Sequence, residues 1–232
     1  MIVQRYLYHS GKWSGRDSHA LEPASVQLVL AFSAKEHLLQ ADCYQELRKM
    51  FPNAEILICS TAGEILDTEV YEDSIAVVAI RFSTTLLKTK SITITDGESS
   101  YDAGLRLLEA FPTDGLTSFL VLSDGSKVNG SELTKALNHI AVKNVSVTGG
   151  LAGDGNRFHE TLVGLNERPK EGVIAGIGFY GPDLKVSHGS GGGFETFGLE
   201  KEVTQSKANI LYEIDGKNAL ELYKKYLGPE AE

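Results

Sequence analysis

The sequence predicts a mixed α/β fold in which mixed β-sheets are flanked by helices. Near-continuous apolar runs at 26–32, 55–59 and 117–122 are typical of strands buried on both faces. The segments 35–50, 100–111 and 131–140 instead repeat apolar residues at helical spacing. Because the two kinds of segment alternate along the chain, strands and helices are expected to share one core.

Composition limits the classes of partner. The chain has 232 residues, 42% of them hydrophobic and 23% charged, which is enough for one large domain or two small ones. Its net charge of -9 argues against nucleic acid and anionic membranes as partners. No apolar run approaches the ~18 residues of a membrane span, and the N-terminus lacks the apolar core of a signal peptide. We therefore expect a cytoplasmic protein.

The remaining elements follow from the same periodicities. Residues 1–25 are irregular and aromatic, and we expect an N-terminal arm lying over the domain. Two strands at 74–82 and 86–95 are expected to form a hairpin, because the second alternates apolar and polar residues. Later strands are expected at 145–148, 158–165, 173–180, 184–190 and 209–214, before a final helix at 218–227 that Gly228 and Pro229 end.

An internal duplication is predicted from the order of these elements. Strand, helix, strand, small-residue turn, strand and strand occur twice, at about 26–95 and 116–190. A shift of ninety positions places Ala62 and Gly63 on Ala152 and Gly153. The matching order and the coincidence of the two Ala-Gly turns carry this prediction, since few other positions are identical.

The two turns are the candidate site. Glycine permits a positive φ and lets a ligand or strand approach the backbone closely. We expect both turns at strand ends, forming the floor of one small-molecule pocket. Backbone N–H groups would hold a carboxylate, and Glu64 or Asp154 an amine. The candidate ligand-binding residues are Ser60, Thr61, Ala62, Gly63, Glu64, Gly149, Gly150, Leu151, Ala152, Gly153 and Asp154.

Each polar candidate also has a purely local interpretation. The carboxylates of Asp154 and Glu64 either contact a ligand or hydrogen-bond the backbone of their own turns. The hydroxyls of Ser60 and Thr61 either reach a ligand or satisfy backbone groups at the strand end. Asp124, before the third helix, marks either an anion site at the helix N-terminus or a local cap, for which Asn129 and Ser131 are further candidates.

Recognisable catalytic patterns are absent from the sequence. The glycines of 149–155 do not have dinucleotide-fingerprint spacing, there is neither a phosphate loop nor a Gly-x-Ser-x-Gly elbow, and the six histidines lack metal-ligand spacing. Cys43 and Cys59 are expected to be buried, reduced thiols. No metal and no catalytic residue is predicted. Two alternatives stay open: a hydrolase with its nucleophile at 59–61, and a pure interaction module.

The ordered motifs resemble a known family. The stretches 60–65 (Ser-Thr-Ala-Gly-Glu-Ile), 149–154 (Gly-Gly-Leu-Ala-Gly-Asp) and 203–216, ending in Asp215-Gly216, are similar to those of the FIST family, the F-box and intracellular signal transduction proteins. The resemblance covers about 27–226. It implies an N-terminal FIST domain over 26–207, followed by the first strand and helix of a C-terminal domain over 208–232.

That resemblance also implies a function. FIST domains are intracellular, bacterial sensory domains that are non-catalytic and bind small ligands such as amino acids. A signalling partner such as a histidine kinase, a cyclase or a chemoreceptor is implied as well. Some relatives resemble haem-binding nitric oxide sensors, which makes haem an alternative ligand. His159 and His188 are the histidines next to the candidate turns and loops.

Overall fold

A computed structural model describes residues 1–15, 17, 21–40, 42–141, 145–193, 195–196 and 198–231. The chain divides into two compact units, Met1–His188 and Gly189–Glu232. All the candidate ligand-binding residues lie in the first unit. His19, one of the six histidines weighed above, lies outside the described residues.

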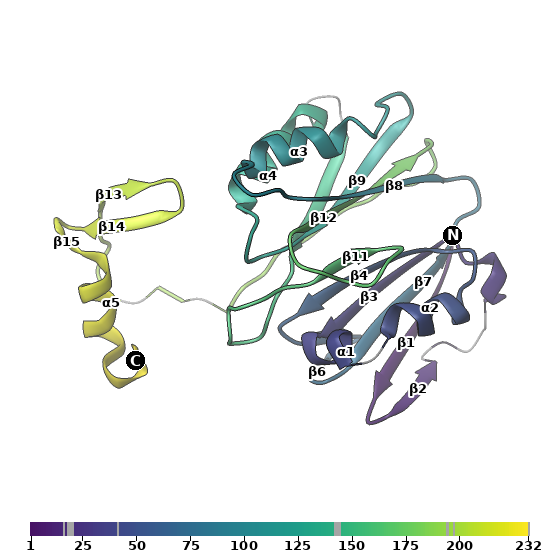
Figure 1. The fold of residues 1–232 in the computed structure, drawn as a ribbon, viewed down its shortest axis with the longest axis horizontal. Helices are drawn as coiled ribbons and strands as arrows, with labels where there is room; N and C mark the ends of the chain where they lie inside the picture. The colour runs from purple at the N-terminus through teal and green to yellow at the C-terminus, as the bar shows by residue number, and fades with distance from the viewer. Residues whose placement is uncertain are drawn as a thin grey trace. The chain divides into compact units, whose positions relative to one another are not determined.

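The first unit contains two large mixed sheets (Figure 1). The six-stranded sheet has the order β11-β4-β3-β7-β1-β2, and the four-stranded sheet has the order β10-β9-β12-β8. The strands of the first sheet are β1 (Ile2–His9), β2 (Lys12–Gly15), β3 (Leu28–Ala34), β4 (Glu55–Thr61), β7 (Ile75–Arg81) and β11 (Val163–Leu165). Those of the second are β8 (Leu86–Thr93), β9 (Leu116–Ser123), β10 (Ser146–Leu151) and β12 (Val173–Tyr180).

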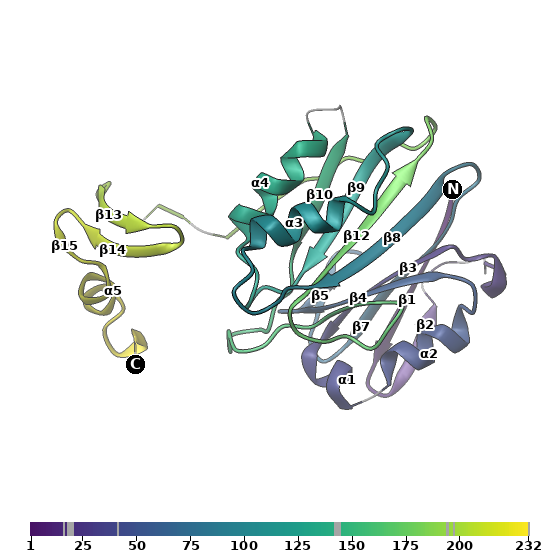
Figure 2. The same cartoon turned by 45° about the horizontal axis from the view of Figure 1, so that its top comes forward.

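Helices cover the outer face of each sheet, so the first unit has four layers (Figures 1 and 2). Helices α1 (Lys35–Gln40) and α2 (Cys43–Met50) pack on the six-stranded sheet through a core that includes Leu38 and Leu47. Helices α3 (Ser100–Leu108) and α4 (Gly130–Ala141) cover the other sheet. A third core, which includes Leu57 and Ile177, joins the two sheets. The small hairpin β5 (Glu64–Leu66) and β6 (Glu69–Tyr71) and the 3-10 turn η1 (Pro23–Ser25) complete the unit.

The two sheets share one arrangement of strands. The order β4-β3-β7-β1 matches β10-β9-β12-β8, and the relative directions agree as well. In each set the first two strands are parallel, and the later neighbours are antiparallel. This shared topology supports an internal duplication, which stays a prediction, and makes β8 the counterpart of β1.

Several expected elements differ in the structure. The helix expected over 35–50 is split into α1 and α2, because the side chain of Asp42 accepts a hydrogen bond from the Gln45 N–H and so caps a new helix. The expected hairpin of 74–82 with 86–95 does not form. Instead, β7 pairs with β1 and β3, whereas β8 pairs with β12 of the other sheet. Residues 1–25, expected as an arm, supply β1, β2 and η1.

The region after residue 145 differs too. Strand β10 continues through Gly149 and Gly150 to Leu151, so the turn begins later than the glycines suggested. The strand expected over 158–165 is only β11, because Phe158 takes a left-handed φ of 53° in the preceding loop. Residues 184–190 form no strand.

The second unit is small. It contains β13 (Val203–Lys207), β14 (Ile210–Ile214), β15 (Lys217–Asn218), α5 (Ala219–Leu227) and the 3-10 turn η2 (Gly228–Ala231). Asn218 caps α5 by accepting from the Glu221 N–H. The domain boundary predicted at 207/208 falls at the turn between β13 and β14 and stays a prediction. No helix within the described part of the chain is long and apolar enough to cross a membrane.

Candidate functional site

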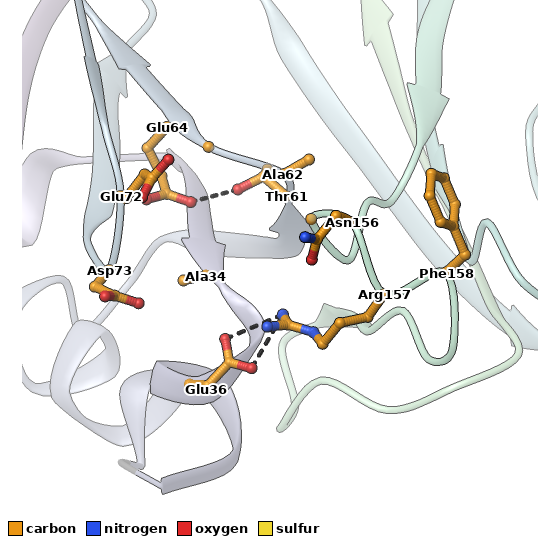
Figure 3. A pocket seen from close by; sticks show the side chains of 12 residues that line it. Ala34, Glu36, Thr61, Ala62, Glu64, Glu72, Asp73, Asn156, Arg157 and Phe158 are labelled. Carbon is orange, nitrogen blue, oxygen red and sulfur yellow. Dashed lines mark hydrogen bonds and ion pairs between the residues drawn. The ribbon is translucent and has the colours of Figure 1, made fainter. Parts of the chain in front are cut away.

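A cavity of about 550 Å³ lies at the carboxyl ends of the parallel strands β3 and β4. In open α/β sheets, this edge is where ligands commonly bind. The first predicted turn supplies part of its wall, and the loop after β10 supplies another part (Figure 3). Its lining residues are Ala34, Glu36, Thr61, Ala62, Gly63, Glu64, Glu72, Asp73, Gly155, Asn156, Arg157 and Phe158.

The two predicted turns do meet at this place. The Gly153 N–H donates to the Ser60 carbonyl at 2.9 Å, and the Ser60 hydroxyl donates to the Gly153 carbonyl at 2.8 Å. The same hydroxyl accepts from the Leu162 N–H at 2.9 Å. A Cβ on Gly153 would lie 3.0 Å from the Ala62 nitrogen. Ser60 and Gly153 therefore join the two turns beneath the cavity, and neither lines it.

Glu64 lies in the cavity wall although the residue is only 1% exposed. Its carboxylate accepts hydrogen bonds from the Thr61 hydroxyl at 2.5 Å, the Ser74 hydroxyl at 2.6 Å and the Ser74 N–H at 3.2 Å. These partners of Glu64 in the described part of the chain are all neutral. The negative charge is thus held in a fixed position without a paired cation.

Asp154 occupies the corresponding place after Gly153 but has a different environment. Its buried carboxylate pairs with the Lys35 ammonium at 3.0 Å and with the Arg157 guanidinium at 2.8 Å. It also accepts from the N–H groups of His159 and Glu160. Burial would raise the pKa of Asp154, but these hydrogen bonds and cations outweigh it and hold the pKa well below its ordinary value. Asp154 is absent from the cavity lining and organises the loop that forms the wall.

Arg157 is the cation of the cavity. Besides Asp154, its guanidinium pairs with Glu36 at 3.0 Å across the two halves of the first unit. Figure 3 shows Glu64, Glu72 and Asp73 on one side, with Asn156 and Arg157 facing them. The described lining therefore contains four carboxylates and one guanidinium. Glu64, Glu72 and Asp73 form an acidic wall opposite Arg157, which is paired with the fourth carboxylate, Glu36 (Figure 3).

Phe158 stands at the rim of the same cavity. It is 89% exposed and has a φ of 53°, which bulky residues rarely adopt. In Figure 3 its ring points away from the acidic wall. The loop before it is held by Asp154, so the ring is presented to solvent by a fixed turn.

Three predicted residues of the second turn lie elsewhere. Gly149, Gly150 and Leu151 line a separate cavity of about 290 Å³ between β9, β10 and α4. Gly149 is required there by packing, because a Cβ would lie 1.8 Å from the Val121 carbonyl oxygen. Ala152 is buried, and its N–H donates to the Ser123 carbonyl at 2.7 Å. The second turn thus does not form the floor of the larger cavity.

Asp124 is also accounted for locally. Its buried carboxylate accepts from the N–H groups of Ser126, Lys127 and Gly172. Although burial would raise its pKa, these hydrogen bonds keep the pKa below its ordinary value. Asn129, rather than Ser131, caps α4 by accepting from the N–H groups of 131 and 132. The cap of α4 is thus Asn129, and the Asp124 carboxylate instead holds its own turn and the Gly172 backbone.

The candidate nucleophiles at 59–61 have little freedom to react. Burial raises the pKa of Cys59 to about 12, and its thiol donates to the Ser60 carbonyl. The Ser60 hydroxyl is fully buried and doubly hydrogen-bonded. Thr61 does have a carboxylate within reach, but Glu64 already accepts two further hydrogen bonds from Ser74. Both oxygens of the Glu64 carboxylate are therefore already engaged in hydrogen bonds.

Haem is a poor fit to this cavity. Haem iron in proteins is usually held by His, Cys, Met or Tyr. None of these types occurs among the described residues that line the cavity. His159 lies outside the lining, where its N–H donates to Asp154, and His188 lies at the end of the first unit.

Sequence reasoning found four of the twelve described lining residues, Thr61, Ala62, Gly63 and Glu64, and missed the other eight. Ala34 and Glu36 follow the end of β3, and Glu72 and Asp73 precede β7. The rule that ligands bind at the carboxyl ends of parallel strands would have found the first pair. Phe158 was expected to begin a strand, and Asn156 and Arg157 lie between that strand and the predicted turn, so neither pattern marked them as part of the site.

Comparison with known proteins agrees with this architecture. The FIST N domain matches residues 27–217, which is most of the chain, while no curated protein matches it. FIST domains are sensory domains associated with signal transduction proteins, and they are typically non-catalytic. The chain belongs to the FIST family.

Proposed function

We propose that the 550 Å³ cavity binds an amino-acid-like ligand and that this ligand controls a signalling partner. The observation that carries the proposal is the position of an acidic wall, Glu64, Glu72 and Asp73, opposite the guanidinium of Arg157 in one cavity (Figure 3). An ammonium group would lie against Glu64 with Glu72 and Asp73, and a carboxylate against Arg157. A zwitterion is the simplest ligand that pairs with both the acidic wall and Arg157.

Glu64 is the central anchor in this proposal. Its charge is held by neutral donors, so an incoming ammonium meets a preformed, uncompensated carboxylate. Desolvation makes such a contact stronger than it would be at the surface. Thr61, Ala62 and Gly63 fix the wall around it, and Asp154 acts as a positioning residue that orients Arg157.

The signal would arise from the loop that carries Arg157. That loop belongs to the second half of the unit, whereas Glu36 and Glu64 belong to the first. A ligand carboxylate would compete with Glu36 for Arg157 and so favour one arrangement of the loop over another. A histidine kinase, cyclase or chemoreceptor that contacts the loop or Phe158 could read this change.

A thermal-shift screen tests the proposal, because a ligand that binds only the folded state raises its stability. The twenty standard amino acids are the probes, each tested beside its N-acetyl and methyl ester derivatives. We expect one class of amino acid to raise the melting temperature. Its N-acetyl and methyl ester derivatives, which lack the ammonium or the carboxylate group, should leave the melting temperature unchanged. Glu64→Gln should abolish the shift, whereas the exposed Glu109→Gln should retain it. No shift with any amino acid would overturn the proposal.

A further inference from the structure

Strand β10 has an unpaired edge. In the described part of the chain it pairs only with β9, and its outer side carries no neighbouring strand. Exposed backbone N–H and C=O groups along such an edge can pair with another chain. Proteins usually protect these edges with charged residues, short strands or bulges.

The other edges of the two sheets are protected in these ways. Strand β8 carries Lys88 and Lys90, both exposed, and β2 is four residues long with Lys12. Strand β11 has only three residues. By contrast, β10 has six residues, Ser-Val-Thr-Gly-Gly-Leu, with no charge. Its last residue, Leu151, is 49% exposed. An uncharged edge also places no like charges opposite each other at the contact between two copies.

The six-stranded sheet shows how the edge that corresponds to β10 is covered. Strand β4 is the topological counterpart of β10, and its outer edge is covered by β11, which runs antiparallel to it. Strand β4 is buried along most of its length, whereas the glycines and Leu151 of β10 are exposed. The place beside β10 that corresponds to β11 is thus open to an antiparallel strand.

We propose that this strand is β10 of a second copy, which would join the two four-stranded sheets about a two-fold axis. Antiparallel pairing of a strand with itself satisfies both the direction set by β11 and the symmetry of a dimer. Opposed residues must point to the same face of the sheet. Val147 and Leu151 both line the 290 Å³ cavity on the α4 side.

A register centred on Gly149 meets this condition. It places Val147 of each copy opposite Leu151 of the other, so that each Leu151 covers the mouth of the other copy's cavity. Gly149 would face its own counterpart, where the missing side chains allow close approach. Because the strand is short, the contact belongs to the small, weak class of interface, and dissociation in the micromolar range is expected.

Sedimentation of the full chain over a concentration series tests the interface. We expect a reversible dimer for the wild type and a monomer for Leu151→Lys, since a charge on both copies would oppose pairing. Leu86→Lys places the same charge on the exposed edge β8 and should remain a dimer. A wild-type protein that stays monomeric up to about 1 mM would refute the proposal.

Disulfide trapping tests the register separately. The double variant Val147→Cys/Leu151→Cys should cross-link two chains on oxidation, because opposed Cβ atoms lie about 4.5–5.5 Å apart. Within one chain these positions are about 13 Å apart along the strand and cannot bridge. Either single variant should remain uncross-linked. A dimer that survives Leu151→Lys without cross-linking in the double variant would show that another surface pairs.

Discussion

Glu64 and Asp154 occupy corresponding places after the two Ala-Gly turns, and both are almost fully buried. Their environments are opposite. Asp154 is neutralised by Lys35 and Arg157, whereas the partners of Glu64 among the described residues are hydroxyl and amide groups. Burying a charged group costs free energy unless the charge is compensated. The two carboxylates are compensated in different ways, by cations for Asp154 and by neutral hydrogen-bond donors for Glu64.

The difference separates a carboxylate that stabilises the fold, Asp154, from one that we propose to bind the ligand, Glu64. A carboxylate that already has two cations has little affinity left for a ligand amine, but it fixes the loop around it. A carboxylate with neutral donors next to a cavity, as Glu64 is, is the one that we propose as the ligand anchor. One copy of the turn thus carries the proposed anchor, and the other supports the loop that bears Arg157.

The largest expected effect is that of Asp154→Asn. It leaves Lys35 and Arg157 without their shared anion in a buried site, which should lower the free energy of unfolding by about 3 kcal/mol. Urea unfolding followed by the fluorescence of the single tryptophan, Trp13, measures this loss. Glu109→Gln, which removes an exposed charge, serves as the control. A loss below about 1 kcal/mol would mean that Asp154 is not structural.

The pH dependence of stability sharpens the same point. Because the folded-state pKa of Asp154 is depressed, its contribution is present above the unfolded pKa of about 4. It is lost as the pH falls through that value towards the folded pKa. Wild-type stability should therefore decline below about pH 5, and Asp154→Asn should decline less steeply. Parallel acid curves for the two proteins would contradict the assignment.

Two adjacent glycines of the second turn provide the next test. Gly149→Ala should cost about 2 kcal/mol, because the new Cβ would lie 1.8 Å from the Val121 carbonyl oxygen. At Gly150 nothing lies within 4 Å of a built Cβ, so Gly150→Ala should be nearly neutral. Urea midpoints of the two variants measure the contrast, and equal costs would show that β10 does not pack on β9 as described.

The smallest expected effect concerns the thiols. Burial raises the pKa of both Cys43 and Cys59 to about 12, so neither should react measurably with a thiol reagent at pH 8 in the folded protein. Both should react after denaturation. Rapid reaction of Cys59 in the folded state would revive the hydrolase alternative.

Much of the fold was predictable because hydrophobic periodicity reports burial directly. The apolar runs that became β3, β4, β9 and β12 and the helical stripe of α4 were found in this way. The pairing partners of the strands were not predictable, since a local sequence pattern does not show that β8 pairs with β12 instead of β7. The family was recognised from ordered motifs, and the domain match confirmed it.

The site was predicted less completely. The meeting of the two turns followed from their shared design, and the Ser60–Gly153 hydrogen bonds confirmed it. Whether an acid after Ala-Gly faces a cavity or a lysine depends on residues distant in sequence, such as Lys35 for Asp154. Arg157 was missed because it lies between the predicted turn, which ends at Asp154, and the strand expected from 158.

Calorimetric titration of the amino acid that gives the largest thermal shift tests the central claim most directly. The account predicts that Glu64→Gln loses at least about tenfold in affinity, or about 1.4 kcal/mol, while its stability stays close to that of the wild type. Glu109→Gln should bind like the wild type. Unchanged affinity in Glu64→Gln would contradict the claim that this carboxylate, held by neutral donors, is the ligand anchor.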